Sequence, residues 1–182
     1  MSDIEQPDYQ SWVGRSESNH DRIDVVRANA LARTLEDDVA RKPLGPIADG
    51  DPLPPLWHWI YFWPVVPTHE TGVDGHPRRG GFLPPVELPN RMWAGGSLDL
   101  YRPLKVGDAV ERRSTIESVV PKTGRSGSLV FVTVRHDYLS DDETCISERH
   151  DIVYREHQSP AANGDPDIAP VWDDGTLWTR TV

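Results

Sequence analysis

The chain has 182 residues, with 19 Lys plus Arg against 29 Asp plus Glu and a formal charge of −10. This length is enough for one or two small domains, and the acidic balance argues against a nucleic-acid backbone or an anionic membrane as the main partner. The longest apolar run, Trp57 to Val66, is too short to span a bilayer, and the N-terminus lacks the pattern of a signal peptide. We therefore expect a cytoplasmic protein whose single cysteine, Cys145, forms no intramolecular disulfide and is buried and inert rather than reactive.

The first predicted element is a helix from about Asp24 to Val39. Its apolar residues recur at three- and four-residue spacing, which indicates one buried face. Asp21 or Asp24 can cap the free N–H groups at its start, and Arg41 and Lys42 precede a stop at Pro43.

The segment from Pro43 to Pro89, called the excursion below, holds 11 of the 17 prolines of the chain. Because proline fixes φ and removes a hydrogen-bond donor, this segment is expected to wrap a surface as an extended chain. Its aromatic run, residues 57–63, is too apolar to stay in water, and it is expected to line either a core or an apolar ligand channel.

Four β-prone runs follow, at residues 97–104, 109–120, 128–139 and 145–155. The gaps between them are short, which favours antiparallel neighbours. The third run is apolar on both sides and is expected to be a central strand covered by the helix. We therefore predict an α+β hot-dog fold, in which an antiparallel sheet wraps around one central helix and the excursion lies between the helix and the second strand. Residues 1–156 are expected to form this single domain, and residues 157–182 a linker or a docking arm that uses Trp172 and Trp178.

The histidines do not form a recognisable metal or catalytic motif. No pair has the helical spacing of a zinc protease site, so we expect no metal, and no phosphate-binding loop points to a cofactor. His20 and Asp21 lie near the helix start and are weak candidates for a general base, although a capping role for Asp21 is favoured; His58 is a third weak candidate. Neighbours on a strand point to opposite faces, so neither His136 nor His150 pairs with the aspartate that follows it, but a cross-strand partner for His136 stays open.

Five stretches carry a family resemblance, in this order: "HWIYFWPVVP", "DGHPRRGGFLPP", "PNRMWAGGSLDLYRPLKVGD", "SGSLVFVTVRH" and "DIVYRE". Together, from about Trp12 to Glu156, the chain resembles the N-terminal half of the MaoC-like hydroxyacyl-thioester dehydratases type 2. This group includes mesaconyl-C4-CoA (3-methylfumaryl-CoA) hydratases. The resemblance implies a double hot-dog fold that adds water to a trans-enoyl thioester or removes it from a 3-hydroxyacyl thioester.

The chain departs from this family at the catalytic motif. The family implies an Asp and a His five residues apart, around an Asn, at the start of the helix of the second repeat. No histidine of this chain has an aspartate five positions before it. The resemblance therefore implies the non-catalytic half, with an acyl-CoA or acyl-ACP thioester as ligand and a MaoC-like catalytic subunit, a homodimer or both as partners. The alternative is a protein that binds acyl-CoA or stabilises an assembly and catalyses nothing.

The arginines around residue 80 are the main candidates for substrate binding. Arg78, Arg79 and Arg91 are predicted to form a basic rim that meets CoA phosphates or an acyl carboxylate. They can instead pair with acidic residues or hold the excursion to backbone carbonyls. The full predicted substrate-binding set is His76, Arg78, Arg79, Gly80, Gly81, Arg91, Met92, Trp93 and Gly95. The large aromatics Trp57, Trp59, Tyr61 and Trp93 are expected to be core or interface anchors rather than substrate contacts.

Overall fold

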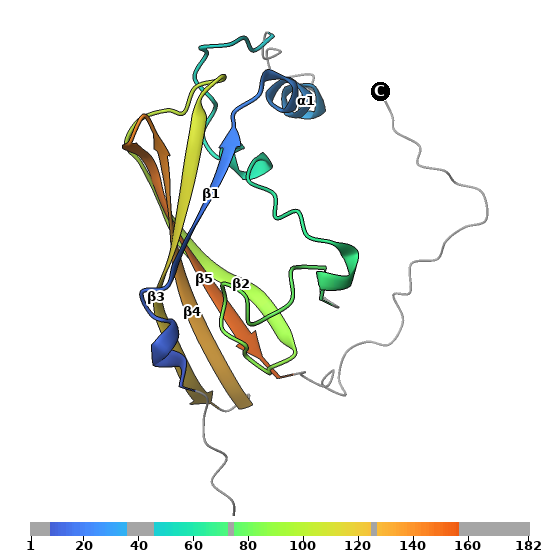
Figure 1. Ribbon diagram of the computed structural model, residues 1–182, viewed down its shortest axis with the longest axis vertical. Coiled ribbons are helices and arrows are strands. Elements are labelled where there is room, and N and C mark those ends of the chain that lie inside the picture. Colours follow the sequence, from blue (N-terminus) through green and yellow to red (C-terminus); the bar gives the residue numbers. More distant parts are fainter. Residues whose placement is uncertain (1–7, 36–45, 73–74, 125–126, 157–182) are drawn as a thin grey trace, which may run out of the picture.

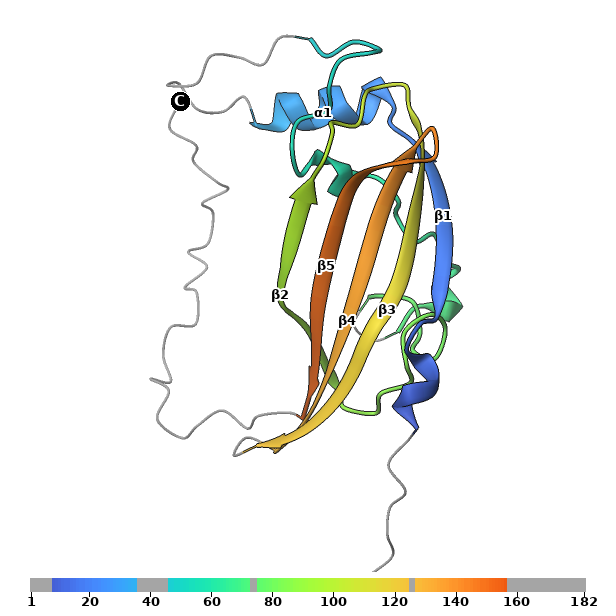
Figure 2. The same cartoon turned by 90° about the vertical axis from the view of Figure 1, so that its left-hand side faces the viewer.

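The computed structural model describes residues 8–35, 46–72, 75–124 and 127–156. Five strands form one antiparallel sheet in the order β1-β3-β4-β5-β2. Their bounds are β1 (Ser16–Arg22), β2 (Asn90–Leu100), β3 (Ala109–Gly124), β4 (Gly127–Ser140) and β5 (Glu143–Arg155). Figures 1 and 2 show one twisted sheet with helix and excursion on the same side, which we call the inner face.

The helix α1 (Val25–Leu35) begins where the sequence predicts. The side chain of Asp24 accepts a hydrogen bond from the backbone N–H of Arg27 at 2.8 Å, which caps the first turn. Ala28 and Ala32 are buried and let the helix pack across one end of the inner face (Figure 2). The predicted end at Val39 lies outside the described residues. No helix in the described part of the chain is both long and apolar enough to cross a membrane.

Three of the predicted strands are confirmed as β3, β4 and β5, and β4 is central. Asp141 and Asp142 join β4 to β5, and both have a positive φ, of 52° and 61°. Two residues with this backbone make the tight turn that matches the twist of a hairpin. Cys145 is fully buried beside this turn, as expected.

The prediction for the 97–104 run is wrong in both extent and neighbour. The strand is β2, it ends at Leu100, and it pairs with β5 instead of β3. Residues 101–108 connect β2 to β3 across the sheet end; this length of extended chain reaches about 26 Å, whereas three strand spacings need only about 14 Å. The sequence reading also missed β1, because this strand is polar throughout and lies exposed at the opposite edge of the sheet.

A β-bulge interrupts β2 between Trp93 and Gly95. Trp93 pairs with Ile152 and Gly95 with Asp151, so Ala94 is an extra residue without a partner on β5. Beyond the bulge the two strands approach closely, since a Cβ at Gly96 would lie 2.2 Å from the Arg149 carbonyl oxygen.

Two apolar clusters occupy opposite ends of the inner face. The first cluster lies near α1 and includes Val110, Tyr138 and Ile146. The second lies at the far end and includes Ile116, Val130, Val132, Val134 and Tyr154. Each of β3, β4 and β5 contributes to both clusters, so the middle of every one of these strands lies between them.

The described part of the excursion covers the inner face beyond α1 (Figure 1). It contains two short 3-10 helices, η2 (Trp57–Ile60) and η3 (Thr68–Glu70). The expected burial of the aromatic run holds for Tyr61 and Phe62, but Trp59 and Trp63 are 54% and 64% exposed. The run is interrupted because Phe62 has a left-handed backbone with φ of 59°, which redirects the chain before Trp63. The predicted arm at 157–182, with Trp172 and Trp178, lies outside the described residues.

Candidate functional site

A band of polar side chains crosses the middle of the inner face, between the two apolar clusters. Side chains on a strand alternate between faces, so the cluster residues fix which positions of β3, β4 and β5 point inward. The inward positions between the clusters are Arg112, Ser114, His136, Glu148 and His150. We call these five residues the polar band. Polar groups inside a fold are costly unless they are paired, which makes this band the first candidate for a functional site.

The Glu148 carboxylate is surrounded by hydrogen-bond donors. Its side chain is 4% exposed, and it accepts hydrogen bonds from His150 Nε2 at 2.6 Å and Trp59 Nε1 at 2.9 Å. His58 Nε2 lies 3.2 Å from it and the Tyr138 hydroxyl 3.3 Å. Burial raises the pKa of Glu148, but the hydrogen bonds and the charge on His150 outweigh burial and hold the pKa well below its usual value. Glu148 is therefore an ionised anchor that joins β5 to η2.

His136 has the cross-strand partners that the sequence left open. Its ring packs against His150 with 4.7 Å between centroids, and its Nδ1 lies 2.8 Å from the Ser114 hydroxyl. Burial, followed by the charges of His150 and Arg112, lowers the pKa of His136 to about 3. His136 is therefore neutral at physiological pH, and it fills the space between β3 and β5 as a hydrogen-bonding group.

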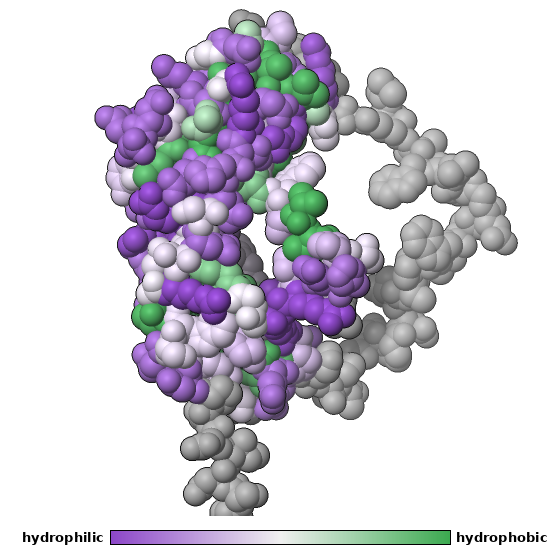
Figure 3. All heavy atoms as spheres, viewed as in Figure 1, coloured by the Kyte–Doolittle hydropathy of each residue, from purple (hydrophilic) through white to green (hydrophobic). Residues whose placement is uncertain are grey.

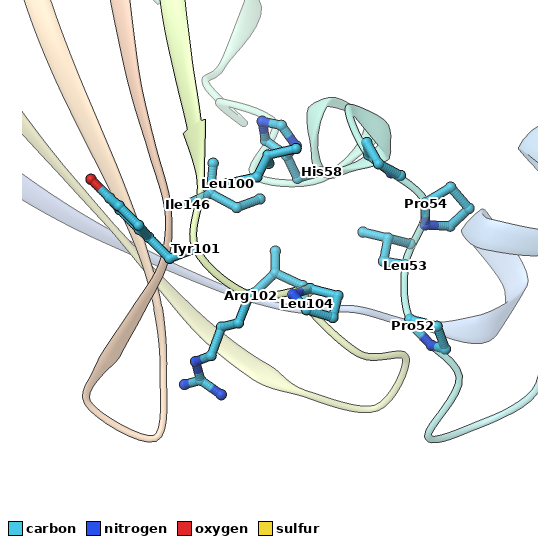
Figure 4. Close-up of a pocket in the computed structure, with 11 residues that line it drawn as sticks. Pro52, Leu53, Pro54, His58, Leu100, Tyr101, Arg102, Leu104 and Ile146 are labelled. Atoms are coloured by element: carbon cyan, nitrogen blue, oxygen red, sulfur yellow. The ribbon is translucent and has the colours of Figure 1, made fainter.

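His58, a weak catalytic candidate from the sequence, belongs to the same network. It is 1% exposed, its Nε2 faces Glu148, and its buried Nδ1 has no hydrogen-bond partner in the described structure. His58 also borders an apolar cavity of about 480 Å³. Figure 4 shows His58 at one edge of this cavity, with the Pro52–Pro54 stretch opposite the end of β2. The other lining residues are Pro55, Leu100, Tyr101, Arg102, Pro103, Leu104 and Ile146.

Asp21 and His20, the other two weak candidates, lie on β1. Asp21 accepts hydrogen bonds from both terminal nitrogens of Arg27, at 2.8 and 2.9 Å, and from the Phe62 backbone N–H at 2.8 Å. The Arg27 hydrogen bonds lower the pKa of Asp21 to about 2. Asp21 thus fixes the excursion at Phe62, whereas His20 is exposed and pairs in register with Glu111.

A second cavity, of about 460 Å³, brings together five of the predicted substrate-binding residues. His76, Arg78, Arg79, Gly81 and Arg91 all line it, and we call it the basic cavity. Figure 3 shows the molecule hollowed between the sheet and the excursion. The remaining lining comes from Glu17, Asn19, Trp63, Pro64, Val65, Val66, Pro77, Phe82, Leu83 and Arg112. Four further predicted residues, Gly80, Met92, Trp93 and Gly95, are not part of this lining.

Arg79 has a structural role within the basic cavity. Its guanidinium donates hydrogen bonds to the carbonyl oxygens of Val86 and Pro89, each at 2.7 Å, and to that of Leu88. It also lies 5.3 Å over the ring of Tyr154. Arg79 therefore matches the alternative in which an arginine holds the excursion to backbone carbonyls.

Sequence reasoning missed Arg112 and Glu148. The signal was present, because Arg112 lies two positions after Val110 and Glu148 two positions after Ile146, so each shares a strand face with an apolar residue of the first cluster. Strand parity could be assigned only once the sheet order was known. In the described part of the chain, no three His, Cys, Asp or Glu side chains gather in a way that could hold a metal ion.

Comparison with known sequences identifies related proteins. The family model for hydroxyacyl-thioester dehydratase type 2 matches residues 56–176. The mesaconyl-C(4)-CoA hydratase of Chloroflexus aurantiacus is 43% identical over 176 residues, which are 96% of this chain and 60% of that protein. The chain therefore spans less than two thirds of the length of this relative.

Comparison with solved structures identifies the fold. A chain of the ChsH1-ChsH2 complex from Mycobacterium tuberculosis matches 82% of this chain and 89% of its own length, with a TM-score of 0.55 and 17% identity. A chain of the C-terminally truncated HadBC (3R-hydroxyacyl-ACP dehydratase) complex from the same organism matches 78% and 96%, with a TM-score of 0.50 and 17% identity. At this identity the likeness concerns the fold alone, and it confirms the predicted α+β hot-dog fold.

Proposed function

The chain belongs to the hydroxyacyl-thioester dehydratase type 2 family, and we propose that it is the substrate-binding, non-catalytic half of an acyl-thioester hydratase or dehydratase. The reaction adds the oxygen of water to Cβ of a trans-enoyl thioester and a proton to Cα, or runs in reverse. The enzyme is then a hydro-lyase whose acid and base come from a MaoC-like partner, either a separate chain or a further domain.

The start of α1 carries the proposal. In the family motif an aspartate precedes a catalytic histidine by five positions at the start of a helix. At the start of α1, Asp24 is present and the residue five positions later is Asn29. Its amide group donates to the carbonyl oxygens of Val25 and Ile47, and its oxygen accepts from the Ile47 backbone N–H at 3.0 Å. Asn29 therefore ties the excursion to the helix and leaves no imidazole to transfer protons.

The other titratable groups near the cavities are also committed to the fold. Hydration needs a base for water, an acid for Cα and donors for the enolate oxygen. Glu148 and Asp21 are ionised by their hydrogen bonds, and both are occupied by donors of the chain itself. His150 is 33% exposed, yet its Nε2 is bound to Glu148. This pattern supports a role in binding and shaping rather than in proton transfer.

The surface along β2 supports a partner. β2 is an edge strand, and no described strand pairs with its outer side. Large apolar side chains gather there, with Met92, Trp93, Leu100 and Tyr101 between 44% and 68% exposed. A second hot-dog domain can pair edge to edge with β2 and cover them. The two M. tuberculosis structures are complexes of hot-dog chains, which agrees with this arrangement.

The test is reconstitution of hydration. The full chain is mixed with the part of the C. aurantiacus hydratase that it does not match, or with a MaoC-like protein that copurifies from its native source. Loss of enoyl-thioester absorbance is then followed with mesaconyl-C4-CoA and crotonyl-CoA. We expect hydration only in the mixture. Hydration by the chain alone would contradict the non-catalytic assignment and return attention to His20, Asp21 and His58.

The alternative function is a stand-alone protein that binds acyl-CoA or stabilises an assembly. The occupied acid and base groups favour it as much as they favour the first proposal. It predicts that the chain binds acyl-CoA, or holds a complex together, while no copurifying protein gains hydratase activity from it.

A further inference from the structure

Arg112 is a cation inside the fold with no direct counter-ion among the described residues. It lies on the inner face of β3, it is largely buried, and its Nε is buried with no hydrogen-bond partner. Among the described residues it forms no ion pair, whereas Arg27, Arg113 and Arg149 each contact a carboxylate. An unpaired buried charge is costly, and a ligand that supplies the missing partner is one explanation for its presence in a folded protein.

The surroundings of Arg112 hold it in place. Its guanidinium lies 5.3 Å over the ring of Phe62 and hydrogen-bonds to the Tyr138 hydroxyl. Phe62 is itself fixed in its left-handed conformation by the hydrogen bond from its N–H to Asp21. A cation positioned in this way is preorganised for a ligand, because binding costs little further ordering.

The basic cavity gives Arg112 access to a ligand. Arg112 lines it together with Arg78, Arg91 and His76, and Glu17 is the one acidic residue among the lining residues. The basic cavity also has apolar walls, formed by Trp63, Val65, Val66, Phe82 and Leu83. A ligand that suits both features has an anionic group attached to a short carbon skeleton.

We propose that Arg112 binds the free carboxylate of a dicarboxylic acyl group, so that the enzyme selects enoyl thioesters with a carboxylate at the end remote from the sulfur. A planar carboxylate matches the fork of one guanidinium. A phosphate would carry more charge into a site with apolar walls. The inference rests on the proposed function for the thioester, but Arg112 binds the carboxylate whether or not turnover follows.

The experiment measures binding without turnover. The dissociation constants of the full chain for mesaconyl-C4-CoA, for its methyl ester and for crotonyl-CoA are determined by calorimetry. Wild-type protein should prefer the free acid, and Arg112→Gln should weaken its binding roughly 10-fold or more, because a charge-assisted hydrogen bond is lost. Binding of the ester and of crotonyl-CoA should change less than about twofold.

Two variants separate recognition from misfolding. Arg112→Lys keeps the charge without the fork and should retain part of the preference for the free acid. Arg113→Gln removes the neighbouring arginine, which faces outward and pairs with Glu111, and should leave all three affinities unchanged. A thermal scan of each variant reports whether the fold is intact.

Three outcomes would overturn the inference. The first is a wild-type chain with no preference for the free acid over its ester. The second is an equal loss for all three thioesters in Arg112→Gln. The third is a loss of inorganic phosphate binding in Arg112→Gln while selection of the free acid persists, which would assign the site to CoA phosphates. Failure of reconstituted hydration with the carboxylate preference intact would instead contradict only the proposed function.

Discussion

The two faces of the sheet hold similar charged residues in opposite states. On the outer face Glu117 accepts hydrogen bonds from Arg135 at 3.1 Å and Arg149 at 2.7 Å, and these side chains remain in contact with water. On the inner face Glu148 is almost fully buried with four donors, and Arg112 is largely buried without an acid. Charged side chains in contact with water tolerate imperfect pairing because water solvates them. Buried charged side chains do not. The inner face therefore carries both the structural and the functional constraints.

Removal of the charge at Glu148 should have the largest effect. Glu148→Gln replaces an acceptor of four hydrogen bonds by a group that also presents N–H donors to His58, Trp59 and His150. Breaking a buried charged network typically costs about 3 kcal/mol or more. Urea unfolding should show this loss as a lower free energy of unfolding. An unchanged free energy of unfolding would mean that the network does not anchor the excursion.

The pH dependence of the free energy of unfolding should report the low pKa of His136. The pKa of His136 is about 3 in the folded chain and near 6.5 in the unfolded chain. Below about pH 6.5 the unfolded chain therefore binds a proton at this histidine that the folded chain does not bind. The free energy of unfolding should therefore fall as pH decreases from 6.5, by up to about 1.4 kcal/mol per pH unit. His136→Gln should remove this slope between pH 6.5 and about 4.5, above the range in which Glu148 contributes. The matched control is His20→Gln, at an exposed position. If the slope of the free energy of unfolding against pH persists in His136→Gln, the slope arises from another group.

A smaller effect is expected at Asp21, which lies between the two environments at 21% side-chain exposure. Asp21→Asn weakens its hydrogen bonds to Arg27 and Phe62, and solvent screening reduces the loss to about 1 kcal/mol. Because Phe62 supports Arg112, this variant should also weaken binding of mesaconyl-C4-CoA. Denaturant unfolding and calorimetry measure the two effects, and a loss of stability without a loss of affinity would separate Phe62 from the ligand site.

The smallest effect belongs to the outer face. Glu117→Gln removes the acid that Arg135 and Arg149 share, and the midpoint of urea unfolding should move far less than for Glu148→Gln. The difference should shrink further in high salt, because exposed pairs are screened. Equal shifts for the two variants would erase the distinction between the faces.

The sequence predicts the local elements better than their arrangement. The start of α1 and the strands β3, β4 and β5 follow from spacing and turns, since these are local properties of the backbone. β1 and the pairing of β2 with β5 do not, because a polar edge strand has no hydrophobic period and an eight-residue connection can reach either neighbour. The pattern of one helix followed by β-prone runs and the family resemblance both indicated the fold class, but neither indicated which strand lies beside which.

The candidate site was predicted in the same uneven way. His76, Arg78, Arg79, Gly81 and Arg91 do meet at one cavity, because the first four follow one another in the proline-rich excursion and Arg91 begins β2 directly after it. Their individual roles depend on contacts across the fold, and Arg79 is held by carbonyl groups that no local pattern specifies. Arg112 and Glu148 became visible only when three strands were placed side by side.

The bulge in β2 acts as a phase shift along that strand. Before it, Arg91 and Trp93 pair with inward residues of β5, and after it Gly96, Leu98 and Leu100 do so as well. Odd-numbered positions face inward on one side of Ala94 and even-numbered positions on the other, so one strand presents a basic residue to the cavity and apolar residues to the core. If Ala94 were instead paired with β5 in a regular ladder, either Arg91 or Leu98 would turn outward, whereas removal of Ala94 would leave both segments in their present register. For comparison of relatives or for redesign, the presence of this bulge is as much a functional property as the identity of the side chains beside it.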